Sequence, residues 1–215
     1  NHEPLQYIIG MWDFHRFSFK VGEGVLIPRP ETELLVDFAV EKIQKNGYSV
    51  VLDLCCGSGC IGLSVAKLCP RVKVFCVDIS DTALEYTRQN KELLGADNVT
   101  VIKSDVLEST GFVGLPRPDI ILSNPPYIRT EDIKGLQEEI AFEPKLALDG
   151  GEDGLIFYRS LSEIWYPFIN RGGYLAMECG EDQAADIVSL FVDKADKGKV
   201  IKDASGLDRV VVIAR

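Results

Sequence analysis

The chain has 215 residues, of which 46% are hydrophobic and 26% are charged, and its formal net charge is −10 at pH 7. This length can bury one substantial core, so we expect one α/β domain with a short extension. The negative charge argues against stable nucleic-acid binding, which needs lysine and arginine to neutralise phosphates. No apolar run reaches the roughly 18 residues of a membrane span, and the first residues lack a secretion signal. We therefore expect a cytoplasmic protein with no membrane partner.

In chain order, residues 1–29 alternate aromatic and polar side chains and then reach an apolar run at 25–27, a pattern typical of a β-hairpin. We expect this segment to connect to a domain that spans 30–215. Pro30 and the acidic residues after it predict an amphipathic helix that ends near Lys45.

Strand-like and helix-like segments alternate after this helix. We expect strands near 49–54, 73–78, 99–103, 118–123, 173–179, 199–203 and 208–214, and helices near 59–68, 81–94, 154–169 and 182–193. Several of the strands are continuously apolar, which is typical of a mostly parallel sheet covered by helices on both faces.

A glycine-rich turn follows the first strand of this series. Residues 50–62 form a strand, a turn and a helix start in which Gly57, Gly59 and Gly62 satisfy G-x-G-x-x-G. Such glycines let the backbone approach a ligand, and Asp78 at the end of the next strand can accept hydrogen bonds from ribose hydroxyls. The pattern predicts a cofactor that contains adenosine, and both NAD and S-adenosylmethionine fit it.

Asp53 favours S-adenosylmethionine over NAD. A carboxylate before the glycine turn suits the amino acid end of S-adenosylmethionine, directly or through water, whereas it would repel a pyrophosphate. Ser104-Asp105-Val106 ends the third strand. There Asp105 could accept from the adenine amine and Val106 could pack on the ring, although Asp105 could also be an ordinary turn or cap residue.

Asn124-Pro125-Pro126-Tyr127 follows the apolar strand at 119–123, where open α/β sheets place their chemistry. The two prolines fix φ and lack N–H groups, so their carbonyls point outward as acceptors. With the Asn124 amide oxygen and the flat Tyr127 ring, they form a cup that suits a planar NH2 group on an amide or a nucleobase. The alternative is a turn that only ends the strand.

The longest irregular stretch, 124–153, is acidic and includes Glu138 and Glu139. A long loop directly after a polar strand end is typical of a substrate wall, here one for a basic partner, although a solvated surface has the same composition.

The six cysteines contain no CxxC pair and lie mostly in apolar runs, so we expect buried free thiols, no disulfide framework and no metal site. Cys60 stands at a predicted helix start, but the two histidines that could activate it, His2 and His15, belong to the N-terminal extension. A cysteine nucleophile is therefore not expected.

Together, these motifs resemble those of the release-factor glutamine methyltransferases, the protein-(glutamine-N5) family also called HemK or PrmC. The likeness runs nearly end to end and includes Pro-Arg-Pro-Glu-Thr-Glu at 28–33, together with residues 24–27, 53–59, 78, 123–128, 143–155 and 208–211. It implies a Rossmann-like class I methyltransferase with a seven-stranded, mostly parallel sheet. It also implies methyl transfer from S-adenosylmethionine, with S-adenosylhomocysteine as product, to the glutamine of the Gly-Gly-Gln loop in class-I peptide chain release factors. The chain would begin after the family's small helical N-terminal domain, in the connecting segment.

The resemblance also implies roles for individual residues. The substrate amide would be bound and positioned by Asn124, Pro125, Pro126 and Tyr127. The cofactor would be bound by Thr32, Asp53, Cys55, Cys56, Gly57, Ser58, Gly59, Asp78, Ile79, Asp105, Val106 and Asn124.

Two positions depart from the family pattern. Cys55 replaces the usual first glycine of the turn, which we expect to be tolerated if its φ is negative, and Val106 stands where some members carry an aromatic residue. An adenine-modifying methyltransferase of DNA or RNA is the nearest alternative function. An NAD-dependent oxidoreductase and a noncatalytic binding module are the others.

Overall fold

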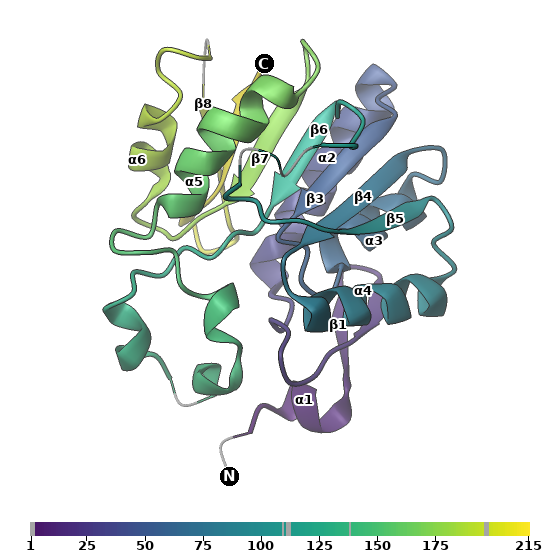
Figure 1. Cartoon of the computed structure of the whole chain (residues 1–215), viewed down its shortest axis with the longest axis vertical. Coiled ribbons are helices and arrows are strands. Elements are labelled where there is room, and N and C mark those ends of the chain that lie inside the picture. Colours follow the sequence, from purple (N-terminus) through teal and green to yellow (C-terminus); the bar gives the residue numbers. More distant parts are fainter. Residues whose placement is uncertain (1–2, 109, 111–112, 138, 196–197) are drawn as a thin grey trace.

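The computed structural model describes residues 3–108, 110, 113–137, 139–195 and 198–215. Its centre is a seven-stranded sheet in the order β5-β4-β3-β6-β7-β9-β8 (Figure 1). Neighbouring strands from β5 to β7 are parallel, whereas β9 is antiparallel to both β7 and β8. The strands are β3 (Val50–Leu54), β4 (Lys73–Asp78), β5 (Val99–Lys103), β6 (Ile120–Ser123), β7 (Tyr174–Glu178), β8 (Gly198–Lys202) and β9 (Asp208–Ala214). The predicted seven-stranded, mostly parallel sheet is therefore confirmed.

Helices cover both faces of the sheet, and successive residues of β3 show how. Val51 packs in one core cluster with side chains of α2 (Glu33–Asn46), α3 (Cys60–Leu68) and α4 (Asp81–Leu94). Leu52 packs in a second cluster with side chains of α5 (Ile156–Ser160) and α6 (Ala184–Ser189). Because side chains alternate along a strand, a sheet covered on both faces needs an apolar residue at nearly every position.

The N-terminal segment contains α1 (Leu5–Ile9) and then the hairpin of β1 (Met11–Phe14) and β2 (Phe17–Lys20). The predicted hairpin is confirmed, but its turn is at 15–16, where His15 has a φ of +56°. The apolar run at 25–27 is not part of a strand. The hairpin packs on α4, where Asn90 Oδ1 accepts from the Lys20 backbone N–H at 2.6 Å and Asn90 Nδ2 donates to the Lys20 carbonyl at 3.0 Å.

Two predicted helices are less regular than the sequence indicates. The helix expected near 154–169 starts as α5, continues through a π-helical turn (Leu161–Trp165) and ends in a 3-10 turn (Tyr166–Phe168). The helix expected near 182–193 is α helical only as α6, and turns follow it. A 3-10 turn (Pro30–Thr32) precedes α2, and three more (Asp132–Gly135, Ile140–Phe142 and Lys145–Ala147) interrupt the loop at 124–153.

The strand order places a crevice between β3 and β6. From β3 the chain adds β4 and β5 on one side and then returns to add β6 on the other, so β3 and β6 lie at a topological switch point. Ligands of open α/β sheets bind outside the carboxyl ends of such strands. Within the described residues, no helix has both the length and the apolar character needed to cross a membrane.

Candidate active site

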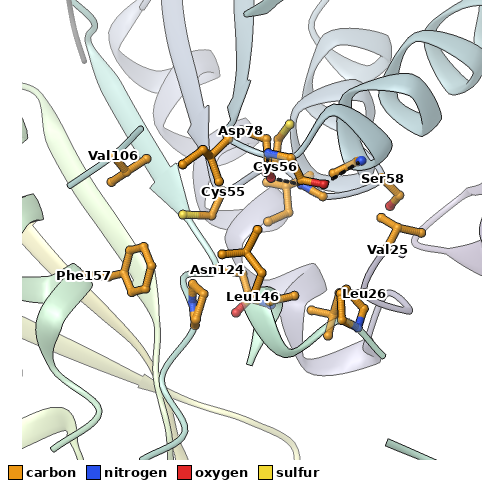
Figure 2. A pocket seen from close by; sticks show the side chains of 18 of the residues that line it. Val25, Leu26, Cys55, Cys56, Ser58, Asp78, Val106, Asn124, Leu146 and Phe157 are labelled. Carbon is orange, nitrogen blue, oxygen red and sulfur yellow. Dashed lines mark hydrogen bonds between the residues drawn. The ribbon is translucent and has the colours of Figure 1, made fainter. Parts of the chain in front are cut away.

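A cavity of about 220 Å³ opens at the carboxyl ends of β3, β4, β5 and β6 (Figure 2). This volume holds far more than one ordered water and suits part of a small organic ligand. One wall is made by residues that end or closely follow the four strands: 55–58, 78–80, 104–107, 124 and 126. The opposite wall comes from segments distant in sequence: 24–26, 28, 32, 144, 146–147 and 157.

The glycine turn after β3 is held by two carboxylates. Asp53 Oδ2 accepts from the Gly62 N–H at 2.8 Å, and Asp78 Oδ2 accepts from the Gly57 N–H at 2.9 Å. Position 62 has no room for a side chain, because a Cβ there would lie 2.6 Å from Cys76 Sγ and 3.0 Å from Asp53 Oδ2. This glycine therefore lets the start of α3 lie directly against β3 and β4.

Two buried carboxyl groups, Asp53 behind the glycine turn and Asp78 in the cavity wall, make the site favourable for a cationic group. Asp53 is fully buried, and its Oδ1 has no hydrogen-bond partner within the described structure. Burial raises the pKa of Asp53 to about 7, against the lowering effect of the Gly62 hydrogen bond and with help from the nearby Asp78 charge. Burial also raises the pKa of Asp78. Because desolvation penalises each anion, a positive charge bound beside them would be stabilising.

The backbone at Cys55 is strained. The sequence predicts that a cysteine is tolerated here if its φ is negative, and this condition is not met. Its φ is +58°, in the left-handed region where glycine has no steric penalty and other residues lose about 1–2 kcal/mol. The cysteine thus occupies a backbone conformation that a glycine would adopt freely. Its side chain lies at the cavity (Figure 2), where burial, followed by the Asp78 charge, raises the pKa of the thiol well above its ordinary value.

In the turn after β5, Asp105 has the hydrogen bond of an ordinary turn residue, which is the alternative role that the sequence left open. Asp105 Oδ1 accepts from the Leu107 N–H at 2.8 Å, as a turn aspartate does, and Asp105 also lines the cavity. Val106 lines the cavity as well, and its carbonyl accepts from Ser160 Oγ at 2.5 Å and from Trp165 Nε1 at 2.9 Å. The π-helical turn after α5 contributes Trp165 and so fixes the position of Val106.

The six cysteines are free, and five of them are buried. Burial raises the pKa of the Cys60 thiol, which disfavours the thiolate that a nucleophile requires. In the described part of the chain, no group of three or more histidine, cysteine, aspartate or glutamate side chains could hold a metal ion.

Asn124 lies in the cavity wall and is tied to the start of α2. Its Nδ2 donates to Thr32 Oγ1 at 3.2 Å, and Thr32 is only 2% exposed. With Nδ2 engaged, Oδ1 is the atom of this amide that can accept from a ligand. Both prolines that follow are buried, and of the two only Pro126 lines the cavity.

Tyr127 is anchored through its backbone. Its carbonyl accepts from Gln183 Nε2 at 2.9 Å, and burial, with the nearby Glu178 charge, raises the pKa of its hydroxyl to about 12.

Among the predicted site residues, four stand outside the described cavity wall: Asp53, Gly59, Pro125 and Tyr127. Asp53 and Gly59 support the glycine turn from behind, since Gly59 begins α3 with a φ of +80°.

An ion pair that the sequence did not single out closes the opposite wall. Glu143 is 5% exposed, its Oε2 accepts from the Ile27 N–H at 3.0 Å, and its Oε1 pairs with Arg29. Both partners lie in motifs that carried the family resemblance, at 24–33 and 143–148, which is the signal that could have revealed the contact. The pair joins two segments that line the cavity.

The acidic loop at 124–153 is described except for Glu138, which lies outside the described residues. Glu139 is exposed. Two other acidic residues of the loop are paired, Asp149 with Lys145 and Asp153 with Arg159.

The chain was compared with known proteins. Residues 31–158 match the family model "Methyltransferase small domain". Release factor glutamine methyltransferases from Thermodesulfovibrio yellowstonii and Clostridium acetobutylicum are each 40% identical to it over 99% of its length, covering 77% and 75% of those proteins. The chain belongs to the release factor glutamine methyltransferase family. The family resemblance predicted from its motifs is thereby confirmed.

Solved structures confirm the class I methyltransferase fold. The hMettl16 catalytic domain, in complex with the MAT2A 3'UTR hairpin 6, has a TM-score of 0.71 at 12% identity and covers 91% of this chain and 75% of that one. A ribosomal protein L11 methylase from Lactobacillus delbrueckii subsp. bulgaricus has a TM-score of 0.60 at 18% identity and covers 87% and 80%. At these identities the likeness concerns the fold.

Proposed function

We propose that this protein transfers a methyl group from S-adenosylmethionine to the side-chain amide nitrogen of the glutamine in the Gly-Gly-Gln loop of class-I peptide chain release factors. The observation that carries the proposal is the Asn124–Thr32 hydrogen bond in the cavity wall, because it leaves an amide oxygen ready to accept from an NH2 group. The family's release factor glutamine methyltransferases, 40% identical to this chain, supply the substrate class.

The cavity fits the cofactor. The cationic amino acid end and sulfonium suit a site with two buried carboxyl groups: Asp78 lines the cavity, and Asp53 lies behind the glycine turn with an unpartnered Oδ1. Asp78 and Asp105 offer acceptors at the ends of β4 and β5, and Ile79 and Val106 offer apolar surface for a ring. When bound, S-adenosylmethionine supplies an electrophilic methyl group. The proposed cofactor residues are those that the sequence predicted, with Asp53 and Gly59 acting from behind the turn.

The protein's contribution to the reaction is positioning. An amide nitrogen is a poor nucleophile, because its lone pair is conjugated with the carbonyl. Asn124 Oδ1 and the Pro125 carbonyl would accept its two hydrogens, while Tyr127, held through its carbonyl by Gln183, would pack on the amide plane. Alignment of this kind can contribute about 7–11 kcal/mol, and the proton can leave after methyl transfer, so no strong base is required.

An adenine-modifying nucleic-acid methyltransferase is the second candidate, because a flipped base presents the same NH2 geometry. The net charge of −10 weighs against it.

The proposal keeps 1–29 as a connecting segment and 30–215 as the methyltransferase domain, with residues 24–28 of the segment also contributing to the cavity. It also implies a cytoplasmic location, where release factors work.

The test is transfer of a labelled methyl group to a purified release factor. We expect label on the Gly-Gly-Gln peptide, located by mass spectrometry, and none on a matched release factor whose glutamine is replaced by alanine. A single-stranded DNA and an RNA oligonucleotide serve as the competing substrates. Labelling of an oligonucleotide but not of the release factor would overturn the proposal.

A further inference from the structure

Asn90 of α4 is fully buried between the N-terminal hairpin and the glycine turn, and it binds both. On the hairpin side, its Oδ1 accepts from the Lys20 N–H at 2.6 Å and its Nδ2 donates to the Lys20 carbonyl at 3.0 Å. On the side of the cavity, the same Nδ2 donates to the Ser58 carbonyl at 2.9 Å. An asparagine amide has two N–H hydrogens, so one hydrogen holds the hairpin and the other holds the turn.

A second buried side chain of α4 holds the same turn. Thr87 Oγ1 donates to the Gly57 carbonyl at 2.8 Å, so two consecutive carbonyls of the turn are bound by α4. Residues three apart on a helix lie on one face, which lets Thr87 and Asn90 reach neighbouring carbonyls. Gly57 and Ser58 both line the cavity (Figure 2). The face of α4 therefore sets the path of the backbone against which a cofactor would lie.

The chain that follows the hairpin runs along α4 to the other wall of the cavity. Val21 and Val25 pack with Ala83 in a small buried cluster. At Gly24 the approach is so close that a Cβ would lie 2.8 Å from Thr82 Cγ2. Gly24 and Val25 line the cavity opposite the glycine turn. The hairpin is thus joined to one wall by its own chain and to the other wall by Asn90.

We propose that Asn90 is a positioning residue through which the N-terminal hairpin and the cofactor-binding turn stabilise each other. A cofactor that holds the turn in place tightens the contact between Asn90 and Lys20. By thermodynamic linkage, an intact contact with the hairpin raises cofactor affinity by the same factor. This inference rests on the proposed function, because it takes S-adenosylmethionine as the ligand of the turn. It gives the hairpin a part in cofactor binding, although the hairpin itself does not line the cavity.

Calorimetry with S-adenosylhomocysteine measures the effect on affinity. Asn90→Ala removes the bond to Ser58 and should weaken binding about tenfold, a usual size for coupling between two sites. Asn98 provides the matched control, because its Nδ2 also donates to two backbone carbonyls, those of Ala66 at 3.2 Å and Val72 at 2.8 Å. None of these three residues lines the cavity, so Asn98→Ala should change the dissociation constant by less than about twofold. Thermal unfolding without ligand checks that both variants are folded.

A second pair of variants loosens the turn without touching the hairpin. Thr87→Val, of similar shape, removes the bond to the Gly57 carbonyl and should weaken binding about threefold to tenfold. Thr87→Ser keeps the hydroxyl and should restore the affinity.

Hydrogen exchange of the wild-type protein tests the coupling directly and still decides if Asn90→Ala does not fold. Saturating S-adenosylhomocysteine should slow exchange of the Lys20 amide and its neighbours in β2 about tenfold more than exchange in β8. Because β8 is the edge strand at the other end of the sheet from β5, it reports the general stabilisation that any ligand gives. The extra protection of β2 should disappear in Asn90→Ala and persist in Thr87→Val at saturation.

Equal protection of β2 and β8 in the wild-type protein would overturn the role of Asn90. So would a dissociation constant for folded Asn90→Ala that lies within about twofold of wild type. Absence of S-adenosylhomocysteine binding by the wild-type protein would instead refute the proposed cofactor. Cofactor binding without methylation of a release factor would refute only the proposed substrate.

Discussion

Replacing Cys55 by glycine should stabilise this protein relative to the alanine variant at the same position. Both substitutions remove the sulfur, but alanine keeps the Cβ that clashes at a φ of +58°. The strain costs about 1–2 kcal/mol for a residue with a Cβ. Glycine in turn gives the unfolded chain about 0.4–1 kcal/mol more conformational entropy to lose. The difference predicts that Cys55→Gly exceeds Cys55→Ala by about 0.5–1 kcal/mol.

Thermal and denaturant unfolding of both variants without cofactor would measure this difference. For a chain of this size, about 1 kcal/mol corresponds to roughly 2–4 °C in Tm. The neighbouring Cys56, whose φ is not positive, provides the control, and there glycine should be less stable than alanine by about 0.5–1 kcal/mol. If glycine were no better than alanine at position 55, the left-handed backbone would not be a source of strain.

Three further perturbations address the site. Asn124→Ala should lower kcat by about 10²–10³, as loss of one preorganised polar contact does, while calorimetry should show little change in cofactor affinity. If the ring face holds the amide, Tyr127→Phe should lower kcat less than Tyr127→Ala does. Glu143→Ala should lower the free energy of unfolding, measured with denaturant, by about 2–3 kcal/mol and should weaken cofactor binding, because it leaves Arg29 and a buried N–H unpaired. An unaltered unfolding midpoint would show that the ion pair does not hold this wall of the cavity in place. The pKa of Asp53 is raised from 3.8 to about 7 in the folded protein, so its contribution to stability is fully present below about 3.8 and is lost as the pH rises from there to about 7. Asp53→Asn should flatten the stability profile in that pH window relative to wild type.

The near wall of the cavity could be predicted from the sequence because it requires only local information. Parallel strands bring their carboxyl ends to one edge of the sheet, so residues that directly follow a strand meet there whatever the strand order. Asp78, Asp105 and Asn124 each follow an apolar segment of strand length, and all three line the cavity. The far wall carries no such signal, because its residues do not follow strands. Phe157, for example, lies in α5, which comes after the long loop at 124–153.

Long-range polar partners were equally out of reach. Glu143 and the backbone of Ile27 are 116 residues apart, and only the folded chain brings them together. Glu178 lies in an apolar strand, where a single acidic residue in the sequence looks like the polar end of the strand. Only the folded chain shows that this carboxyl is buried, with 2% of the residue exposed.

The error at Cys55 has a different origin, because it concerns a single backbone angle. A cysteine favours negative φ, and the only signal against that preference is the glycine that the family usually has at this position. In the folded chain, however, the Cys56 N–H donates to the Val77 carbonyl at 3.1 Å, which continues the contact between β3 and β4 one step beyond the strands. The Gly57 N–H then donates to Asp78 at 2.9 Å. With the next two residues held by the neighbouring strand, the backbone at 55 must turn sharply, and the hydrogen bonds around it outweigh the local strain. The tertiary contacts of β4 thus set the conformation that a family glycine would adopt without strain.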